Sequence, residues 1–284
     1  MSQITAVLEK DLKEFLRDKV ILFFTFLLPI FFVLMLPLMW GDIPHEIVPS
    51  LKGGVSLTMI TFMVMVAGQS NLAGSITSDR ERGLYLKIIS MPITPLKEAV
   101  GRICGVGVFT LLGALLLLGV GVVYGADITG DITSVVESVG FFFLIAMAAT
   151  GTGLIIASVI KGESAATHAG IALTLLTAFL GGMFVPYSML PSFLQVFARI
   201  HPIPSANALI VFLLQGEAFV DYNPFTAGQI GLTIVESCAL FVIGLILYSR
   251  IYFQTWILIP SPPHTRKTGS ENRSRQQIPL ERSF

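Results

Sequence analysis

Charged residues are scarce in this sequence, and their scarcity argues against a soluble protein. Only 13% of the 284 residues are charged, 54% are hydrophobic and the mean hydropathy is +0.79. Soluble domains carry about 25% charged residues. The composition therefore predicts an integral membrane protein.

Cysteine and recognisable catalytic motifs are also few. Cys104 and Cys238 both lie inside apolar runs, which disfavours a disulfide framework or a thiolate metal site. The sequence has neither a Gly-x-x-x-x-Gly-Lys-[Ser/Thr] phosphate loop nor a His-Glu-x-x-His zinc motif. We therefore expect no enzyme activity, metal or cofactor in this chain, and no nucleic-acid partner.

Six apolar runs are long enough to cross a membrane, which takes about 20 mainly apolar residues in a helix. The runs are Val20–Trp40, Gly53–Thr77, Ala99–Tyr124, Ser138–Ile160, Ala165–Val185 and Gln229–Tyr248. The sequence therefore predicts an all-α integral membrane protein. Its six transmembrane helices occupy residues 20–249, between an N-terminal segment (1–19) and a C-terminal tail (250–284).

The two ends of the chain differ in character. In residues 1–19 the apolar side chains share one helical face; they are Ile4, Val7, Leu8, Leu12, Phe15 and Leu16. This pattern predicts an amphipathic interfacial helix whose apolar face lies on the membrane surface, with a partner-facing role as the alternative. The tail is rich in Ser, Pro and Arg from about residue 260 onward, which predicts disorder.

Lysine and arginine are distributed unequally between the connections. All 18 of these residues except Lys52 and Arg199 fall on one side of the predicted spans. Cytoplasmic connections of membrane proteins carry an excess of Lys and Arg. Both termini and the stretch Ser78–Leu96 are therefore predicted to be cytoplasmic, in a chain that crosses the cell membrane.

The stretch Ser78–Leu96 is strongly charged and lies between two long apolar runs. Ser78 and Glu81 have the spacing of a capping box at a helix start, and Pro92 disfavours the α conformation at the residue before it. Apolar residues recur on one helical face between them: Leu84, Tyr85, Ile88, Ile89 and Met91. The pattern predicts a short amphipathic helix with an apolar docking face, and an ordinary loop is the alternative. The rim of that face would be formed by Asp79, Arg80, Glu81 and Arg82.

The connection Pro186–Gly228 is apolar for most of its length, yet several prolines interrupt it. Irregular backbone at membrane depth is tolerated only where protein or a cavity covers it. The pattern predicts two short helices that dip into the outer leaflet, the second capped by Ser205. A pair of helices lying flat on the outer surface is the alternative.

Glu236 is the acid that lies well inside a predicted span. Intramembrane acids are costly and usually mark a pathway or a proton relay. The alternative is a carboxyl group bonded to a neighbouring helix, such as one that bears Gln69, Asn71, Thr150 or Thr174.

Two motifs, in this order and topology, resemble the permease subunit of the ABC type-2 transporter family. The first is Asp79-Arg-Glu81-Arg-Gly83 with Met91-Pro92-Ile-Thr94, and the second is Gly182-Met-Phe184-Val-Pro186 with Met189-Leu-Pro191 and His201-Pro202. The resemblance covers Lys10–Tyr248. The family more often has Asn where His201 stands and Glu where Asp79 stands, which cautions against transferring a substrate.

The resemblance implies roles for these segments. Ser78–Met91 would be a coupling helix that sits in a cleft of a separate ATPase, through Asp79, Arg80, Glu81, Arg82, Gly83, Leu84, Ile88, Met91 and Pro92. The segment after the fifth span would form an outer re-entrant gate, with Pro186, Pro191, Phe193, Phe197, His201 and Pro202. Two permeases, as a homodimer or heterodimer, would work with two ATPases that bind ATP and Mg²⁺, among membrane lipids.

The function implied is that of a permease subunit of an ATP-driven exporter. Its cargo would be an amphipathic or hydrophobic molecule such as a drug, an antibiotic or a lipid-like compound. Export of a lipid-linked glycan or polysaccharide is the alternative within this class. A membrane-embedded enzyme and a membrane scaffold without transport activity are the alternatives from other classes.

Overall fold

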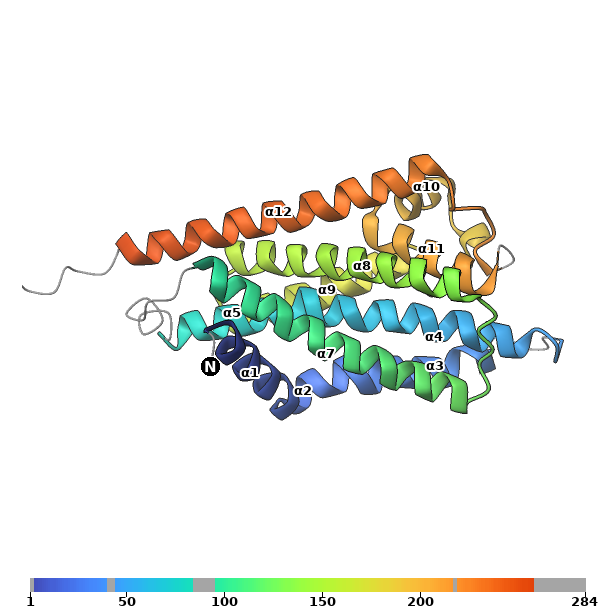
Figure 1. Cartoon of the computed structure of the whole chain (residues 1–284), viewed down its shortest axis with the longest axis horizontal. Helices are drawn as coiled ribbons and strands as arrows, with labels where there is room; N and C mark the ends of the chain where they lie inside the picture. The colour runs from blue at the N-terminus through green and yellow to red at the C-terminus, as the bar shows by residue number, and fades with distance from the viewer. Residues whose placement is uncertain (1–2, 40–43, 84–94, 217–218, 258–284) are drawn as a thin grey trace, which may run out of the picture.

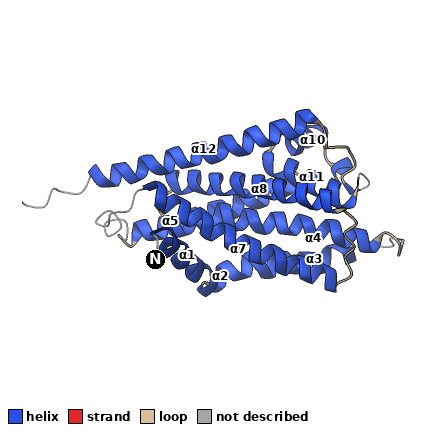
Figure 2. Cartoon of the chain, viewed as in Figure 1, coloured by secondary structure: helices blue, strands red, loops and turns tan. Residues whose placement is uncertain are grey.

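A computed structural model describes residues 3–39, 44–83, 95–216 and 219–257, and these ranges contain helices and connections but no strand (Figure 2). The first half holds α1 (Gln3–Arg17), α2 (Lys19–Leu22), the π-helix η1 (Phe23–Leu27), α3 (Leu28–Met39), α4 (Val48–Met65), the π-helix η2 (Val66–Asn71), α5 (Leu72–Glu81) and α7 (Pro95–Val123). The second half holds α8 (Ile132–Val159), α9 (Glu163–Leu180), the 3₁₀ turn η3 (Tyr187–Met189), α10 (Ser192–Ile200), α11 (Pro202–Gln215) and α12 (Ala227–Ile257). The prediction of an all-α protein is confirmed.

Four helices of the described ranges are long and apolar enough to cross a membrane. They are Val48–Glu81, Lys97–Val123, Ile132–Val159 and Ala227–Arg250. The pair α10 and α11, bent by 85°, would make a fifth if it counts as one span. Phe23–Met39 is shorter, and α9 does not meet the same test, so the six-span count stays a prediction.

One end of the bundle holds α1, the end of α5, the start of α7 and the end of α12 (Figure 1). Ion pairs and hydrogen bonds join the end of α5 to α1, α7, α8 and α9 there. At the opposite end, the connection after α7 reaches α4, where the Asp127 N–H donates to the Pro49 carbonyl at 2.9 Å. Lys52 and Arg199 lie at this second end, and the arrangement agrees with the predicted Lys and Arg asymmetry.

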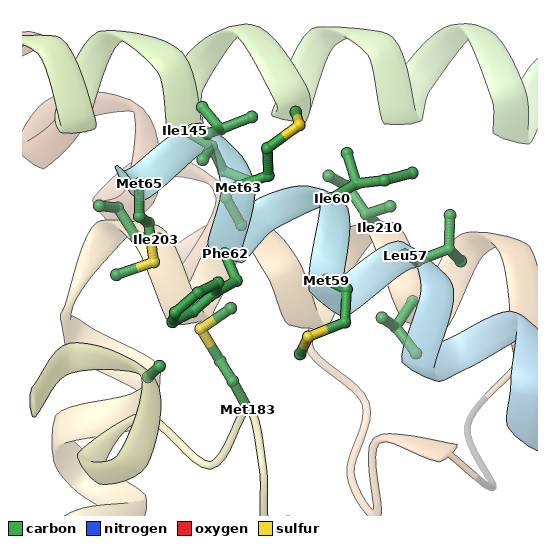
Figure 3. Packing of buried hydrophobic residues seen from close by; sticks show 14 of the residues in the cluster. Leu57, Met59, Ile60, Phe62, Met63, Met65, Ile145, Met183, Ile203 and Ile210 are labelled. Carbon is green, nitrogen blue, oxygen red and sulfur yellow. The ribbon is translucent and has the colours of Figure 1, made fainter. Parts of the chain in front are cut away.

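The helix made of α4, η2 and α5 forms the centre of the bundle. In its most apolar stretch 94% of the residues are buried, compared with 33% for α7 and 17% for α12. It is also the least hydrophobic of the four long helices, as expected for the helix that is surrounded by protein while the others leave apolar faces exposed. Figure 3 shows Met59, Phe62 and Met63 of α4 packed against side chains from other segments, including Ile145 and Met183. The exposed faces of α7 and α12 are apolar, as a lipid-facing or subunit-facing surface requires.

One local prediction is wrong: no helix begins at Ser78, because the second long helix continues through Ser78 to Glu81. The apolar face of α1 packs partly on protein, since Phe15 is fully buried with its ring 5.2 Å from that of Phe109 on α7, whereas Leu16 on the same face is 52% exposed. The position of α1 on the membrane surface therefore stays a prediction. The tail from residue 258 lies outside the described residues.

Candidate functional site

The motif Asp79–Gly83 forms the last turn of the second long helix. Arg82 follows the last helical residue, and Gly83 has a φ of 66°, a left-handed conformation that suits glycine after a helix end. Four other residues predicted to contact an ATPase lie outside the described residues: Leu84, Ile88, Met91 and Pro92. The described part therefore shows only the first residues of the predicted coupling segment, up to Gly83.

Arg102 of α7 lies at the centre of a buried polar cluster beside this turn. Its side chain is 1% exposed, Nε donates to Glu98 Oε1 at 2.8 Å, and a terminal nitrogen donates to the Ser75 hydroxyl at 3.2 Å. The same guanidinium is hydrogen-bonded to the carboxylate of Asp79, which is 4% exposed. A buried charge is stable only when it is paired and hydrogen-bonded. Arg102 thus fastens the end of α5 to the start of α7.

The helix α1 joins this cluster through Lys10 and Asp11. Lys10 forms an ion pair with Asp79, and a carboxylate oxygen of the fully buried Asp11 lies 3.5 Å from the Arg102 guanidinium. Burial raises the pKa of the Asp11 carboxyl, and the nearby positive charges of Arg102 and Lys10 offset this only in part. The amphipathic N-terminal helix is therefore bound to the bundle by charges as well as by Phe15.

The last helix also reaches the cluster, because the Tyr248 hydroxyl of α12 donates to Glu98. Ser75 donates to Glu14 at 3.2 Å, which adds a second contact with α1. We call this set the Arg102 cluster: Lys10, Asp11, Glu14, Ser75, Asp79, Glu98, Arg102 and Tyr248. It connects α1, α5, α7 and α12 at the end of the bundle that is rich in Lys and Arg.

The other charged residues of the motif divide between inward and outward positions. The Arg80 guanidinium donates to the carbonyls of Ala157 and Ile160, and so caps the end of α8. Arg82 lies 3.7 Å from Glu163 of α9 in an exposed ion pair. The prediction that four charged residues form the rim of a docking face is therefore wrong for Asp79 and Arg80, whose side chains are bonded to other helices of this chain. Glu81 and Arg82 are exposed.

Gln69 and Asn71 lie in the π-helix η2 near the middle of the bundle, and both are almost fully buried. Gln69 Oε1 accepts a hydrogen bond from Thr174 of α9 at 3.0 Å, and Asn71 Nδ2 donates to Thr25 of η1 at 2.9 Å. The two π-helical segments are thus joined directly. These polar groups connect neighbouring helices, which favours a packing role for them over a place on a pathway.

Glu236 of α12 does not contact the partners proposed for it from the sequence. Gln69 is bonded to Thr174, Asn71 to Thr25, and the Thr150 hydroxyl to carbonyls of its own helix. Glu236 Oε2 is buried without a hydrogen-bond partner in the described part of the chain. The expectation of a bond to those residues is wrong, and the pathway interpretation of Glu236 stays a prediction.

The predicted outer gate begins at Pro186 and turns sharply at His201. Pro191 precedes α10, on which Phe193 is 69% exposed, and the Phe197 ring is tilted against the His201 ring with 5.1 Å between their centres. His201 Nδ1 accepts the Ile203 N–H at 3.3 Å and caps α11, whose first residue is Pro202. Proline suits the first position of a helix because the backbone N–H of that position makes no hydrogen bond within the helix, so its absence costs nothing.

The helix α11 enters the bundle and does not lie flat on its outside. Most of its residues are buried, and it packs on α4, α8 and α12. Ser205, predicted to cap this helix, is instead fully buried inside it, with its hydroxyl 2.7 Å from that of Thr233 on α12. His201 takes the capping role because the helix starts one turn earlier than predicted.

The two motifs thus lie at opposite ends of one bundle. The chain was also compared with models of known protein families. The family model described as ABC-2 type transporter matches residues 2–213. The chain belongs to the ABC-2 type transporter family. No match among curated proteins was found. The chain is therefore a membrane-embedded transport permease, and its sequence carries no nucleotide-binding motif of its own.

Sequence reasoning missed most of the Arg102 cluster of this ABC-2 type permease. Lys10 and Arg102 entered that reasoning only as positive charges on one side of the membrane. A signal was present, because Glu98 and Arg102 stand four residues apart at the start of a long apolar helix, the spacing of an ion pair. Nothing in the sequence marks Tyr248 as their partner.

Proposed function

We propose that this permease is the transmembrane subunit of an ATP-driven exporter that moves an amphipathic or hydrophobic molecule out of the cytoplasm or the inner leaflet. The observation that carries the proposal is the Arg102 cluster. It fixes α1 and the last turn of α5 to α7 and α12, so a displacement of either segment is passed to helices that run the length of the bundle.

The chain needs partners for this activity. A separate ATPase, in two copies, would bind ATP and Mg²⁺ and contact the segment that follows Gly83, while a second permease would complete the pathway among membrane lipids. ATP can move the permease only through contacts that differ between two states of the ATPase. The charged turn Glu81–Gly83 and the exposed face of α1 lie where such contacts can form.

Variants at Leu84 and Ile88 test the coupling. Exchange of both for Asp is expected to abolish co-purification with the ATPase, because truncation of a central interface anchor commonly costs about 2 kcal/mol or more. Membrane level should stay normal, since the exchange lies outside the long helices. The control is Glu137→Ala, at an exposed position near the start of α8. Normal co-purification and normal ATP-dependent export by the Asp variant would contradict the proposal.

The orientation is tested by single cysteines in a chain that lacks Cys104 and Cys238, both of which are free thiols. A cysteine at Arg82 should react with an impermeant maleimide only after the cells are opened. A cysteine at Asp131, which caps the start of α8 at the other end of the bundle, should react in intact cells. Both termini are expected to be cytoplasmic in the plasma membrane. The reverse labelling pattern would reject this orientation.

A further inference from the structure

A cavity of 280 Å³ lies at the end of the bundle away from α1. It is partly open and is lined mainly by α4, α11 and the segments 181–187 and 219–222. Lining residues recur every three or four positions from Ile47, which immediately precedes α4, to Met59, so they form one face of this helix. With a rise of 1.5 Å per residue, this face is about 18 Å long. The cavity is therefore elongated along the bundle.

The inner end of this apolar cavity is polar. Asn207 of α11 and Thr58 of α4 both line it, and they are 7% and 8% exposed. Asn207 Nδ2 donates to the Thr58 hydroxyl at 3.4 Å, which is long for a hydrogen bond, and Asn207 Oδ1 has no partner in the described ranges. A buried amide left without a partner is destabilising. This pair is thus suited to a further polar group.

The chemistry of the cavity restricts what it can hold. A hydroxyl group both donates and accepts, so it can satisfy either orientation of the Asn207 amide and the Thr58 hydroxyl. A protein cavity of about 150 Å³ holds benzene, so 280 Å³ accommodates roughly ten to twelve non-hydrogen atoms. The remaining walls are mainly aliphatic and aromatic, and their polar side chains are those of Tyr187, Asp221 and Tyr222.

We propose that this cavity binds an elongated apolar molecule that carries a terminal hydroxyl group. The hydroxyl would be bound by Asn207 and Thr58, and the chain would lie along α4 toward Tyr187 and Tyr222. Such binding goes beyond the proposed function, since it requires neither a particular direction of transport nor an ATPase.

The experiment uses two photoreactive probes on the purified full-length chain in lipid nanodiscs. One is an eight-carbon alcohol with a diazirine in mid-chain, and the other is the matched alkane without the hydroxyl. Labelling of Val55, which lines the cavity about one helical turn from Thr58 toward Ile47, is divided by labelling of Leu115, a 59% exposed residue of α7, which corrects for partition into the bilayer. This ratio should be about 5- to 10-fold higher for the alcohol, because the alkane leaves the polar pair unsatisfied.

Two variants make the test specific. Asn207→Leu should bring the alcohol ratio down to that of the alkane, whereas Thr152→Val, on α8 and outside the cavity lining, should preserve the difference. Gly54→Leu should remove cavity labelling by both probes, because a Cβ at Gly54 meets only ordinary contacts with Phe219 and Val211 and a longer side chain fills the space. Melting temperatures establish that each variant is folded.

Labelling during ATP turnover with the ATPase separates two sources of the occupant. Labelling that falls on turnover supports a transported molecule in the cavity, and labelling that is unchanged supports a resident lipid. Equal ratios for alcohol and alkane in the native chain would overturn the proposal, as would an alcohol preference that survives Asn207→Leu.

Discussion

Arg102→Met is expected to destabilise the permease by about 3–5 kcal/mol, since it removes one partner from a buried ion cluster and leaves charges without compensation. The guanidinium is hydrogen-bonded to Glu98, Ser75 and Asp79 at once and is 1% exposed, so bulk water does not reach the groups that would lose their partner. The measurement is the melting temperature of the purified chain in detergent, together with its level in the membrane.

Two control variants separate this effect from a general loss of positive charge. Arg82→Ala removes an arginine from the same end of the bundle, but its ion pair with Glu163 is exposed on both sides, and such pairs contribute about 0–1 kcal/mol. Arg102→Lys keeps the charge but not the planar set of donors, so its melting temperature should lie between those of Arg102→Met and Arg82→Ala. Similar melting temperatures for Arg102→Met and Arg82→Ala would show that the cluster does not hold this end together.

The cluster also shows where sequence reasoning succeeds and where it fails. The motif Asp79–Gly83 was predicted to follow the second long apolar run, and it lies at the end of the helix that contains this run; charge is rare in this chain, so its position is informative. The capping-box interpretation of Ser78 failed because Ser-x-x-Glu describes a helix start only where no helix precedes it. Here the apolar helix from Val48 continues, and Ser78 is buried within it.

The outer segment was predicted with similar partial success. Its prolines indicated two short helices, and the structure has α10 and α11 with an 85° bend between them. The cap was assigned to Ser205 because serine is a common capping residue. In the structure Ser205 is occupied by its contact with Thr233 of α12, and His201 caps α11. A contact between such distant parts of the chain leaves no local pattern in the sequence. The two π-helical segments were missed for the same reason.

The π-helix η2 depends on close approaches at glycines, and the sequence shows these glycines without showing what they contact. The π-helix η2 lies between α8 and α9, and both helices approach it through glycine. A Cβ at Gly153 of α8 would lie 1.9 Å from the Gly68 carbonyl oxygen, and one at Gly170 of α9 would lie 2.5 Å from that of Gln69. Gly68 faces α8 in return, since its own Cβ would lie 2.7 Å from Ala149 Cβ. Backbone atoms form most of these contacts, so rotation of a side chain cannot relieve them.

We therefore expect Gly153→Ala to be destabilising by about 3 kcal/mol or more, at or above the upper end of the usual cost of overpacking a core. One added methyl group would force α8 away from η2 and weaken the hydrogen bonds that η2 makes with α9 and η1. The matched control is Gly140→Ala in the same helix, where a Cβ meets nothing within 4 Å. That exchange should be stabilising by up to about 1 kcal/mol, because alanine favours a helix over glycine. Thermal unfolding of both variants under identical conditions makes the comparison, and equal melting temperatures would refute the close approach of α8 to η2.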